Sequence, residues 1–371
     1  MKEHRLESIV PERPRRSSGW VLAKGLCLVL VVAFFCGLLV RASDSVRHPV
    51  RRAHYLMGTI FEITAYGEDA GRTAEAVEEA FAAIRRADEI ISNYRDDSDL
   101  SRLNREGAAA FVSVPEELYN IVRESVKYSR LTNSAFDATV GPLVAAWWRA
   151  AGQNRLLSDA ERRQLLARVG YSHLQIDDQR LAVRFDWPGV EIDLGGIGKG
   201  WAIDRAVAVL RRYGIERALV NAGTSTIFAL GSPPGQPAWN IAVRHPRNED
   251  QFLAVLSLKD QSLSTSASYE KHLEIQGKSF SHILDPRTGM PVEGMLSCTV
   301  LAPTAVESDA LSTAGFVLGM EKAERLLRQM GLSGILAGVG PQSSKMVVRR
   351  IASPAQDAVF QLLRSREGEN D

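Results

Sequence analysis

Four short polar segments carry the side chains with which this sequence could perform chemistry, and one of them opens a predicted helix. In that segment Asp309 and Thr313 are four residues apart, so both side chains lie on one helical face. A carboxylate and a hydroxyl supply hard oxygen atoms that suit Mg²⁺, which usually completes its shell with water and substrate phosphates. A structural role stays open, because Ser308 or Asp309 can also cap the helix.

The glycine-rich segment Gly195–Gly200 joins a predicted strand to another predicted helix. Such a turn presents backbone N–H groups at a helix start, where phosphate binds well, and Lys199 adds a positive charge. The segment lacks the Lys-Ser/Thr of a nucleoside-triphosphate loop, and its G-x-G-x-G spacing differs from the dinucleotide fingerprint. A tight turn that needs glycine for steric reasons explains the composition equally well.

The other two segments are less specific by themselves. His282 precedes Asp285-Pro286-Arg287-Thr288-Gly289, and its imidazole could contact a ligand, although the pentapeptide is also good turn chemistry. Residues 135–143 combine Phe136, Asp137 and a Gly-Pro turn, and their spacing alone assigns no role.

Composition places these segments in an ordinary globular body. The chain has 371 residues, of which 24% are charged and 45% apolar, which argues against disorder, collagen and coiled coil. The first 52 residues carry ten Lys or Arg and four Asp or Glu, whereas the remainder carries 35 and 40. An acidic body lacks the broad basic face of a nucleic-acid-binding protein. Of three cysteines only Cys298 lies in the body, so no intramolecular disulfide is expected there.

The amino-terminal segment has the layout of an export signal. Basic residues precede an apolar run of 16 residues, Gly25–Val40, which becomes 21 when counted from Trp20. We therefore predict a signal or membrane anchor over residues 1–42, with cleavage after Ala42 left open. Basic residues before the run favour a cytoplasmic amino terminus, so the body is expected on the periplasmic side of the inner membrane. Residues 43–52 are predicted to be a polar linker.

Hydrophobic periodicity predicts the elements that must position the four segments. Strands are expected at 53–66, 173–177, 181–186, 190–194, 217–222, 226–230, 239–244, 252–258, 333–338 and 345–351. Helices are expected at 72–91, 116–130, after the capping box at Ser158, at 201–213, and at 308–330 with an interruption near Gly319. The absence of regular βαβ alternation favours an α+β class. The body is assigned to one domain over 53–355, followed by a tail at 356–371.

Taken together and in this order, the segments resemble the ApbE family of flavin transferases. The resemblance covers roughly residues 53–350 and rests on Met57-Gly58-Thr59, Tyr94 with Asp97-Ser98 and Asn104, 135–143, 193–200, Asn221-Ala222-Gly223, 281–291 and 309–319. It implies a mixed, largely antiparallel sheet core with flanking helices. It also implies Mg²⁺-dependent transfer of the FMN half of FAD to a Ser or Thr hydroxyl of a target protein, with release of AMP.

The resemblance also implies roles for individual positions. The metal ligands would be the main-chain carbonyl of Gly196 and the side chains of Asp309 and Thr313. The FAD pocket would be lined by Met57, Tyr94, Ala135, Phe136, Asp137, Lys199, His282 and Ile283. His282 would be the base near the acceptor hydroxyl, and Asp285 could orient it.

The resemblance further implies that the acceptor is a subunit of a membrane redox complex, such as sodium-pumping NADH:quinone reductase or Rnf. Two alternatives stay open at this point: hydrolysis of FAD to FMN and AMP at the same site, and flavin binding without turnover.

Overall fold

The structure is a computed structural model that describes residues 49–353 and 359–362, except for 224, 270–271 and 341–344. The predicted anchor at 1–42 lies outside these residues. None of the helices in the described part of the chain combines the length and apolar character that a membrane span requires.

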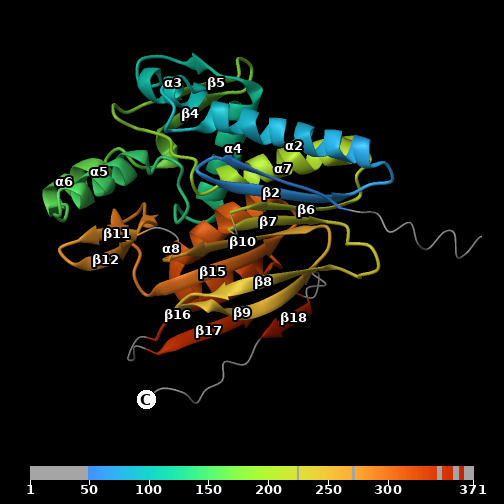
Figure 1. The fold of residues 1–371 in the computed structure, drawn as a ribbon. Coiled ribbons are helices and arrows are strands. Elements are labelled where there is room, and N and C mark those ends of the chain that lie inside the picture. Colours follow the sequence, from blue (N-terminus) through green and yellow to red (C-terminus); the bar gives the residue numbers. More distant parts are fainter. Residues whose placement is uncertain (1–48, 224, 270–271, 341–344, 354–358, 363–371) are drawn as a thin grey trace, which may run out of the picture. The chain divides into compact units, whose positions relative to one another are not determined.

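An eight-stranded sheet forms the centre of the domain (Figure 1). Its strands, in spatial order, are β1 (Val50–Leu56), β2 (Thr59–Tyr66), β6 (Arg217–Ala222), β7 (Thr226–Leu230), β10 (Gln261–Ala267), β15 (Met295–Ala302), β16 (Ser333–Val339) and β17 (Met346–Ile351). All neighbouring strands are antiparallel. The predicted α+β class with a largely antiparallel sheet is therefore confirmed.

Successive side chains along each strand point to opposite faces of the sheet, and each face packs into its own hydrophobic core. In β15, for example, Val300 and Ala302 belong to one core, whereas Leu301 between them belongs to the other. The first core lies under the helices α2 (Ala70–Ile91), α7 (Gly198–Arg212) and α8 (Ala305–Gln329). The second core lies under a three-stranded sheet of β8 (Trp239–His245), β9 (Asn248–Leu258) and β18 (Val359–Leu362).

Smaller elements surround the helical face. They are α3 (Asp99–Glu106), β3 (Val112–Ser113), α4 (Glu116–Leu131), α5 (Gly141–Gly152), α6 (Asp159–Leu166), the 3-10 turn η1 (Tyr171–His173), β4 (Leu174–Asp177) and β5 (Ala182–Phe185). Two short hairpins lie between β10 and β15, namely β11 (His272–Ile275) with β12 (Lys278–Ser281), and β13 (Leu284–Asp285) with β14 (Met290–Pro291).

The structure corrects two predicted strands. Residues 53–66 form two strands rather than one, because Met57 and Gly58 have φ of 51° and 73° and make a two-residue hairpin turn. Residues 190–194 belong to no sheet and share only one bridge, between Glu191 and Val140. The side-chain amide of Asn104 takes the place of a partner strand, because it both donates to the Ile192 carbonyl (2.9 Å) and accepts from the Ile192 N–H (2.8 Å).

Several boundaries also differ from the predictions, and β9 and α8 begin at Asn248 and Ala305 rather than at 252 and 308. Strand β1 begins at Val50, inside the predicted linker at 43–52. Strand β18 lies inside the predicted tail at 356–371 and pairs with β9. Helix α7 begins at Gly198, three residues earlier than expected.

Candidate functional site

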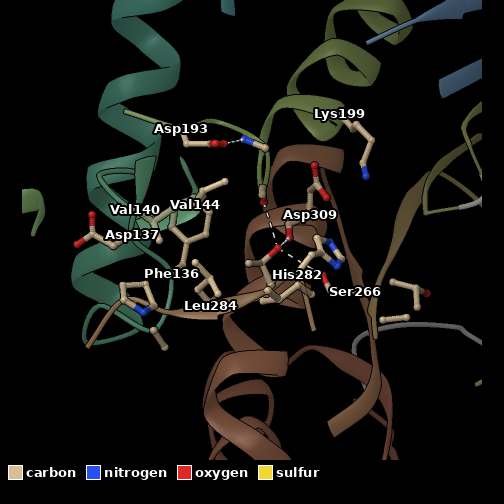
Figure 2. A pocket seen from close by; sticks show the side chains of 18 of the residues that line it. Phe136, Asp137, Val140, Val144, Asp193, Lys199, Ser266, His282, Leu284 and Asp309 are labelled. Atoms are coloured by element: carbon tan, nitrogen blue, oxygen red, sulfur yellow. Dashed lines mark hydrogen bonds between the residues drawn. The ribbon is translucent and has the colours of Figure 1, made fainter. Parts of the chain in front are cut away.

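A cavity of about 220 Å³ lies where the glycine-rich segment, the start of α8, the end of β10 and the loop after β12 meet. It brings together all of the predicted site residues except Met57. They are Tyr94, Ala135, Phe136, Asp137, Gly196, Lys199, His282, Ile283, Asp309 and Thr313. Figure 2 shows Phe136, Val140 and Val144 on one wall, with Lys199, Asp309, His282 and Ser266 across from them.

Asp309 is a buried carboxylate whose hydrogen-bond donors are neutral. One oxygen accepts from the backbone N–H of Gly200 (2.9 Å), and the other accepts from the hydroxyls of Thr226 and Ser264 (3.2 Å each). The residue is 4% exposed, and within the described part of the chain no Lys or Arg forms an ion pair with it. A buried charge without a counter-ion is costly, so this position favours a bound cation.

Thr313 and Gly196 contribute two further oxygen atoms to the same cavity. The Thr313 hydroxyl is 3.4 Å from the Gly196 carbonyl oxygen and 3.2 Å from the Asp309 carbonyl oxygen. Adjacent ligands of an octahedral Mg²⁺ are about 3 Å apart, since each lies about 2.1 Å from the ion. The described residues hold no group of three His, Cys, Asp or Glu side chains suited to a metal. A hard cation here would therefore need main-chain, hydroxyl and substrate oxygens.

Helices α7 and α8 cap each other. Asp309 of α8 accepts from Gly200 at the start of α7, whose N-cap residue Ile197 provides no side-chain hydrogen bond. Asp204 of α7 accepts in return from the N–H groups of Ala305 and Val306 at the start of α8 (2.8 and 2.9 Å). Burial raises the pKa of Asp204, while these two hydrogen bonds act in the opposite direction.

The glycine-rich segment is consequently less available to phosphate than its sequence indicates. The N–H of Gly200 is taken by Asp309, and the N–H of Gly195 is taken by Asp193 (2.7 Å). Glycine is also sterically required at Gly200, where an added Cβ would lie 2.2 Å from the Ala305 carbonyl oxygen. The steric interpretation therefore applies at Gly200, and Lys199 remains the cationic group that this segment contributes to the cavity.

Serine and threonine side chains fill the contact between α8 and the strands beneath it. We call Thr226, Ser262, Ser264, Ser266, Ser308 and Ser312 the hydroxyl seam; all of them are buried. Three pairs within it lie at hydrogen-bond distance: Thr226 with Ser264 (2.9 Å), Ser262 with Ser308 (2.8 Å) and Ser266 with Ser312 (2.9 Å). Small side chains let α8 approach the sheet closely, and they direct two hydroxyls at Asp309.

The loop that carries Phe136 is held by Asp137. The Asp137 carboxylate accepts from the N–H and hydroxyl of Thr139 (3.0 and 2.7 Å) and from the N–H of Tyr171 (2.9 Å). Asp137 lines the cavity, as predicted, but these contacts make its side chain a positioning group for the loop.

His282 lies between β12 and β13 and lines the cavity. The suggested orienting role of Asp285 stays a prediction, and both carboxylate oxygens of Asp285 are also engaged by the guanidinium of Arg287 (2.8 Å each). That hydrogen-bonded pair raises the pKa of Arg287.

Met57 lies outside the cavity-lining set. Its N–H donates to the Asp88 carboxylate (3.2 Å), and its side chain lies against Gly198. Met57 thus supports the glycine-rich segment from the side of the β1–β2 turn.

Two aromatic residues stand exposed at the cavity. Tyr94 is 93% exposed, and partial desolvation of its hydroxyl, followed by the nearby Asp193 carboxylate, raises its pKa. Trp148 on α5 is 45% exposed and was not among the predicted residues. The pair Trp147-Trp148 was the available signal, because neighbouring residues on a helix point about 100° apart and therefore meet different surroundings. Trp147 is the buried member and donates to the Gly289 carbonyl (2.8 Å).

Comparisons with known proteins agree with this geometry. The ApbE family profile matches residues 57–336. An "FAD:protein FMN transferase" from Salmonella typhimurium is 34% identical over 283 residues, which span 75% of this chain and 81% of the relative. The protein of the same name from Treponema pallidum is 32% identical over 320 residues, spanning 81% and 87%.

Solved structures give the same result. The ApbE protein from Thermotoga maritima superposes with a TM-score of 0.74 at 29% identity, covering 82% of this chain and 97% of that protein. The flavin transferase ApbE from Vibrio cholerae superposes with a TM-score of 0.72 at 26% identity and the same coverage.

Proposed function

The chain belongs to the ApbE family, and on that premise we propose how its cavity performs the family's reaction. The protein transfers the FMN part of FAD to a target protein, the activity for which its relatives are named. The finer features proposed are the metal, the base, the acceptor hydroxyl and the cellular location.

Mg²⁺ is proposed to bind at Asp309, Thr313 and the carbonyl of Gly196. The observation that carries this assignment is the buried Asp309 carboxylate, which has neutral donors and no ionic partner among the described residues. The bound ion would neutralise charge that develops on the pyrophosphate of FAD. The donor set fits a hard cation, since all three groups offer oxygen.

The remaining chemistry is assigned to side chains of the cavity. The acceptor's Ser or Thr oxygen forms a bond to the FMN phosphorus, and the bond from that phosphorus to the bridging oxygen breaks. AMP leaves with the bridging oxygen, and the hydroxyl proton passes to the imidazole of His282. A base so placed contributes about 10²–10⁴-fold. Lys199 adds positive charge near the phosphates.

Apolar groups of the cavity are suited to the flavin. Phe136, Val140 and Val144 form one wall, and the exposed rings of Tyr94 and Trp148 offer faces for stacking. This arrangement separates an apolar wall for the ring system from the polar wall at Asp309 and Lys199.

The metal assignment is tested with two matched carboxylate variants. Asp309→Asn keeps the shape of the side chain but removes its charge, and we expect transfer to fall at least about 10²-fold. Binding of Mg²⁺ to the FAD-loaded protein, measured by calorimetry, is expected to be lost as well. Asp204→Asn removes the other helix-capping carboxylate, which is partly buried and does not line the cavity, and is expected to lose stability but retain transfer and Mg²⁺ binding.

Transfer and hydrolysis are separated in the same assay by following AMP release and the intact mass of the acceptor. An FMN-sized mass gain on the acceptor supports transfer, whereas AMP with free FMN supports hydrolysis. Unchanged transfer and Mg²⁺ binding in Asp309→Asn would refute the metal assignment.

The acceptor and the location are proposed from the sequence. Residues 1–42 would tether the domain to the periplasmic side of the inner membrane, where the acceptor would be a subunit of a membrane redox complex. The basic residues before the apolar run Gly25–Val40 support this orientation.

A further inference from the structure

A second hollow, of about 490 Å³, adjoins the cavity that contains His282 and Asp309. Strand β12 forms one side of this groove, and Ser268 with residues 292–294 forms the other. Ser268 directly follows the cavity-lining Ala267, and Ser281 of β12 directly precedes His282. At both points a single peptide unit, about 3.8 Å between Cα atoms, separates the groove from the cavity.

The groove exposes an open strand edge. Among the described strands β12 pairs only with β11, through a hairpin whose turn residues Gln276 and Gly277 have φ of 52° and 71°. A two-residue turn makes Ile275 and Lys278 the first hydrogen-bonded pair, and the pattern then alternates. Ser279 and Ser281 fall on the alternate positions, so their backbone N–H and C=O groups point away from β11.

The opposite wall is anchored and keeps the groove open. Val292 donates its N–H to the Ile283 carbonyl (2.9 Å), Gly294 accepts from the Val339 N–H (2.8 Å), and Ser268 donates its N–H to the Leu296 carbonyl (3.1 Å). The last two bonds tie the wall to β16 and β15 of the main sheet, and the first joins it to the residue that follows His282.

We propose that this groove binds an extended segment of the acceptor protein, which pairs with β12 as an added strand. The inference rests on the proposed transferase function, because a protein acceptor must bring its hydroxyl within hydrogen-bond reach of His282. Four residues of β12 span about 13 Å, which matches an acceptor segment of about four residues. Main-chain hydrogen bonds would supply the affinity, and the groove leads the segment to the neighbour of His282.

The test uses the same substitution on the two edges of one hairpin. Ser279→Pro removes an outward N–H that the hairpin does not use, and proline is tolerated at such an edge position. Glu274→Pro is the matched control, because Glu274 faces Ser279 in the register and its own outward N–H points to the other edge. Intact-mass kinetics measure KM for the acceptor domain of a sodium-pumping NADH:quinone reductase subunit, and flavin fluorescence measures FAD binding.

We expect Ser279→Pro to raise the acceptor KM by about tenfold, and Glu274→Pro to leave it unchanged. FAD is expected to bind both variants as it binds the unaltered protein, which shows that the cavity is intact. Equal KM values in the two variants would overturn the groove assignment.

Photocrosslinking detects binding of the acceptor domain to the enzyme without requiring FMN transfer. The same acceptor domain carries a benzoylphenylalanine two residues before its target hydroxyl, and crosslinks to the full-length enzyme are mapped by mass spectrometry. Crosslinks at 278–281 or 292–294 support the groove even if the wild-type enzyme transfers no FMN, an outcome that would refute the proposed function alone. Crosslinks confined to other surfaces would overturn the groove while leaving the transferase function intact.

Discussion

Two glycines four residues apart in the glycine-rich segment should differ strongly in their response to the same substitution. At Gly200 an added Cβ would lie 2.2 Å from the Ala305 carbonyl oxygen and 2.8 Å from the Val306 Cα. Both atoms are backbone of α8, so the helix itself must move. At Gly196 the nearest atoms are the side-chain Cγ2 and Oγ1 of Thr313, both at 3.2 Å. These atoms can yield by a few tenths of an ångström.

The cost at Gly200 follows from the displacement. An ordinary C···O contact is about 3.3 Å, so α7 and α8 must separate by about 1 Å. Overpacking of this kind costs about 1–3 kcal/mol. The shift also takes the Gly200 N–H out of range of Asp309, a loss of about 1.5–3 kcal/mol for a hydrogen bond to a charged group. The better helix propensity of alanine returns up to about 1 kcal/mol, which leaves a net loss of about 2–5 kcal/mol.

Urea denaturation followed by circular dichroism measures the effect. Gly200→Ala should lower the free energy of unfolding by about 2–5 kcal/mol, whereas Gly196→Ala should change it by less than about 1 kcal/mol. Gly200→Ala should also weaken transfer, because Asp309 moves with α8. Equal unfolding midpoints for the two variants would refute the argument that α7 and α8 are locked at their starts.

Two further predictions concern the remaining cysteine and the amino terminus. Burial raises the pKa of Cys298 from 9.0 to about 12, so the free energy of unfolding should fall as the pH rises from about 9 toward 12, where only the unfolded chain loses this proton. At pH 8, in protein with Cys27→Ser and Cys36→Ser, dithionitrobenzoate should react only at the rate of unfolding, and rapid reaction would contradict the burial. Alkaline phosphatase fused to the carboxyl terminus of the full chain should be active in cells if the domain is exported, and an inactive fusion that is present at normal levels would contradict the proposed location.

Periodicity and segment order predicted much of what the structure contains. The face of α2 with Val77, Phe81 and Ile84 is buried as the helical spacing requires. Gly319 interrupts α8 with a φ of 77°, as expected for a glycine inside a helical pattern. The resemblance named site residues from six separate stretches of sequence, and one cavity is lined by all of them except Met57.

Two of the features that were missed depend on partners distant in sequence, and a third is a turn without its usual sequence signal. Asp204 caps a helix that begins about a hundred residues later, and no local pattern distinguishes it from a solvated acid on α7. Residues 190–194 have strand-like alternation, but the amide of Asn104 occupies the place of a neighbouring strand. The turn at Met57-Gly58 lacks the usual Asn-Gly or Asp-Gly signal, so one strand was expected where two exist.

The hydroxyl seam can adapt to the binding of a cation beside Asp309, because its hydrogen bonds can be redirected. A hydroxyl can donate or accept, and it switches by rotating one hydrogen while its oxygen stays in place. Thr226 and Ser264 can therefore both donate to the Asp309 carboxylate when it stands alone, and one of them can instead donate to the other once a cation shares the charge. The heavy atoms around the proposed cation site therefore need not rearrange when the ion binds or leaves.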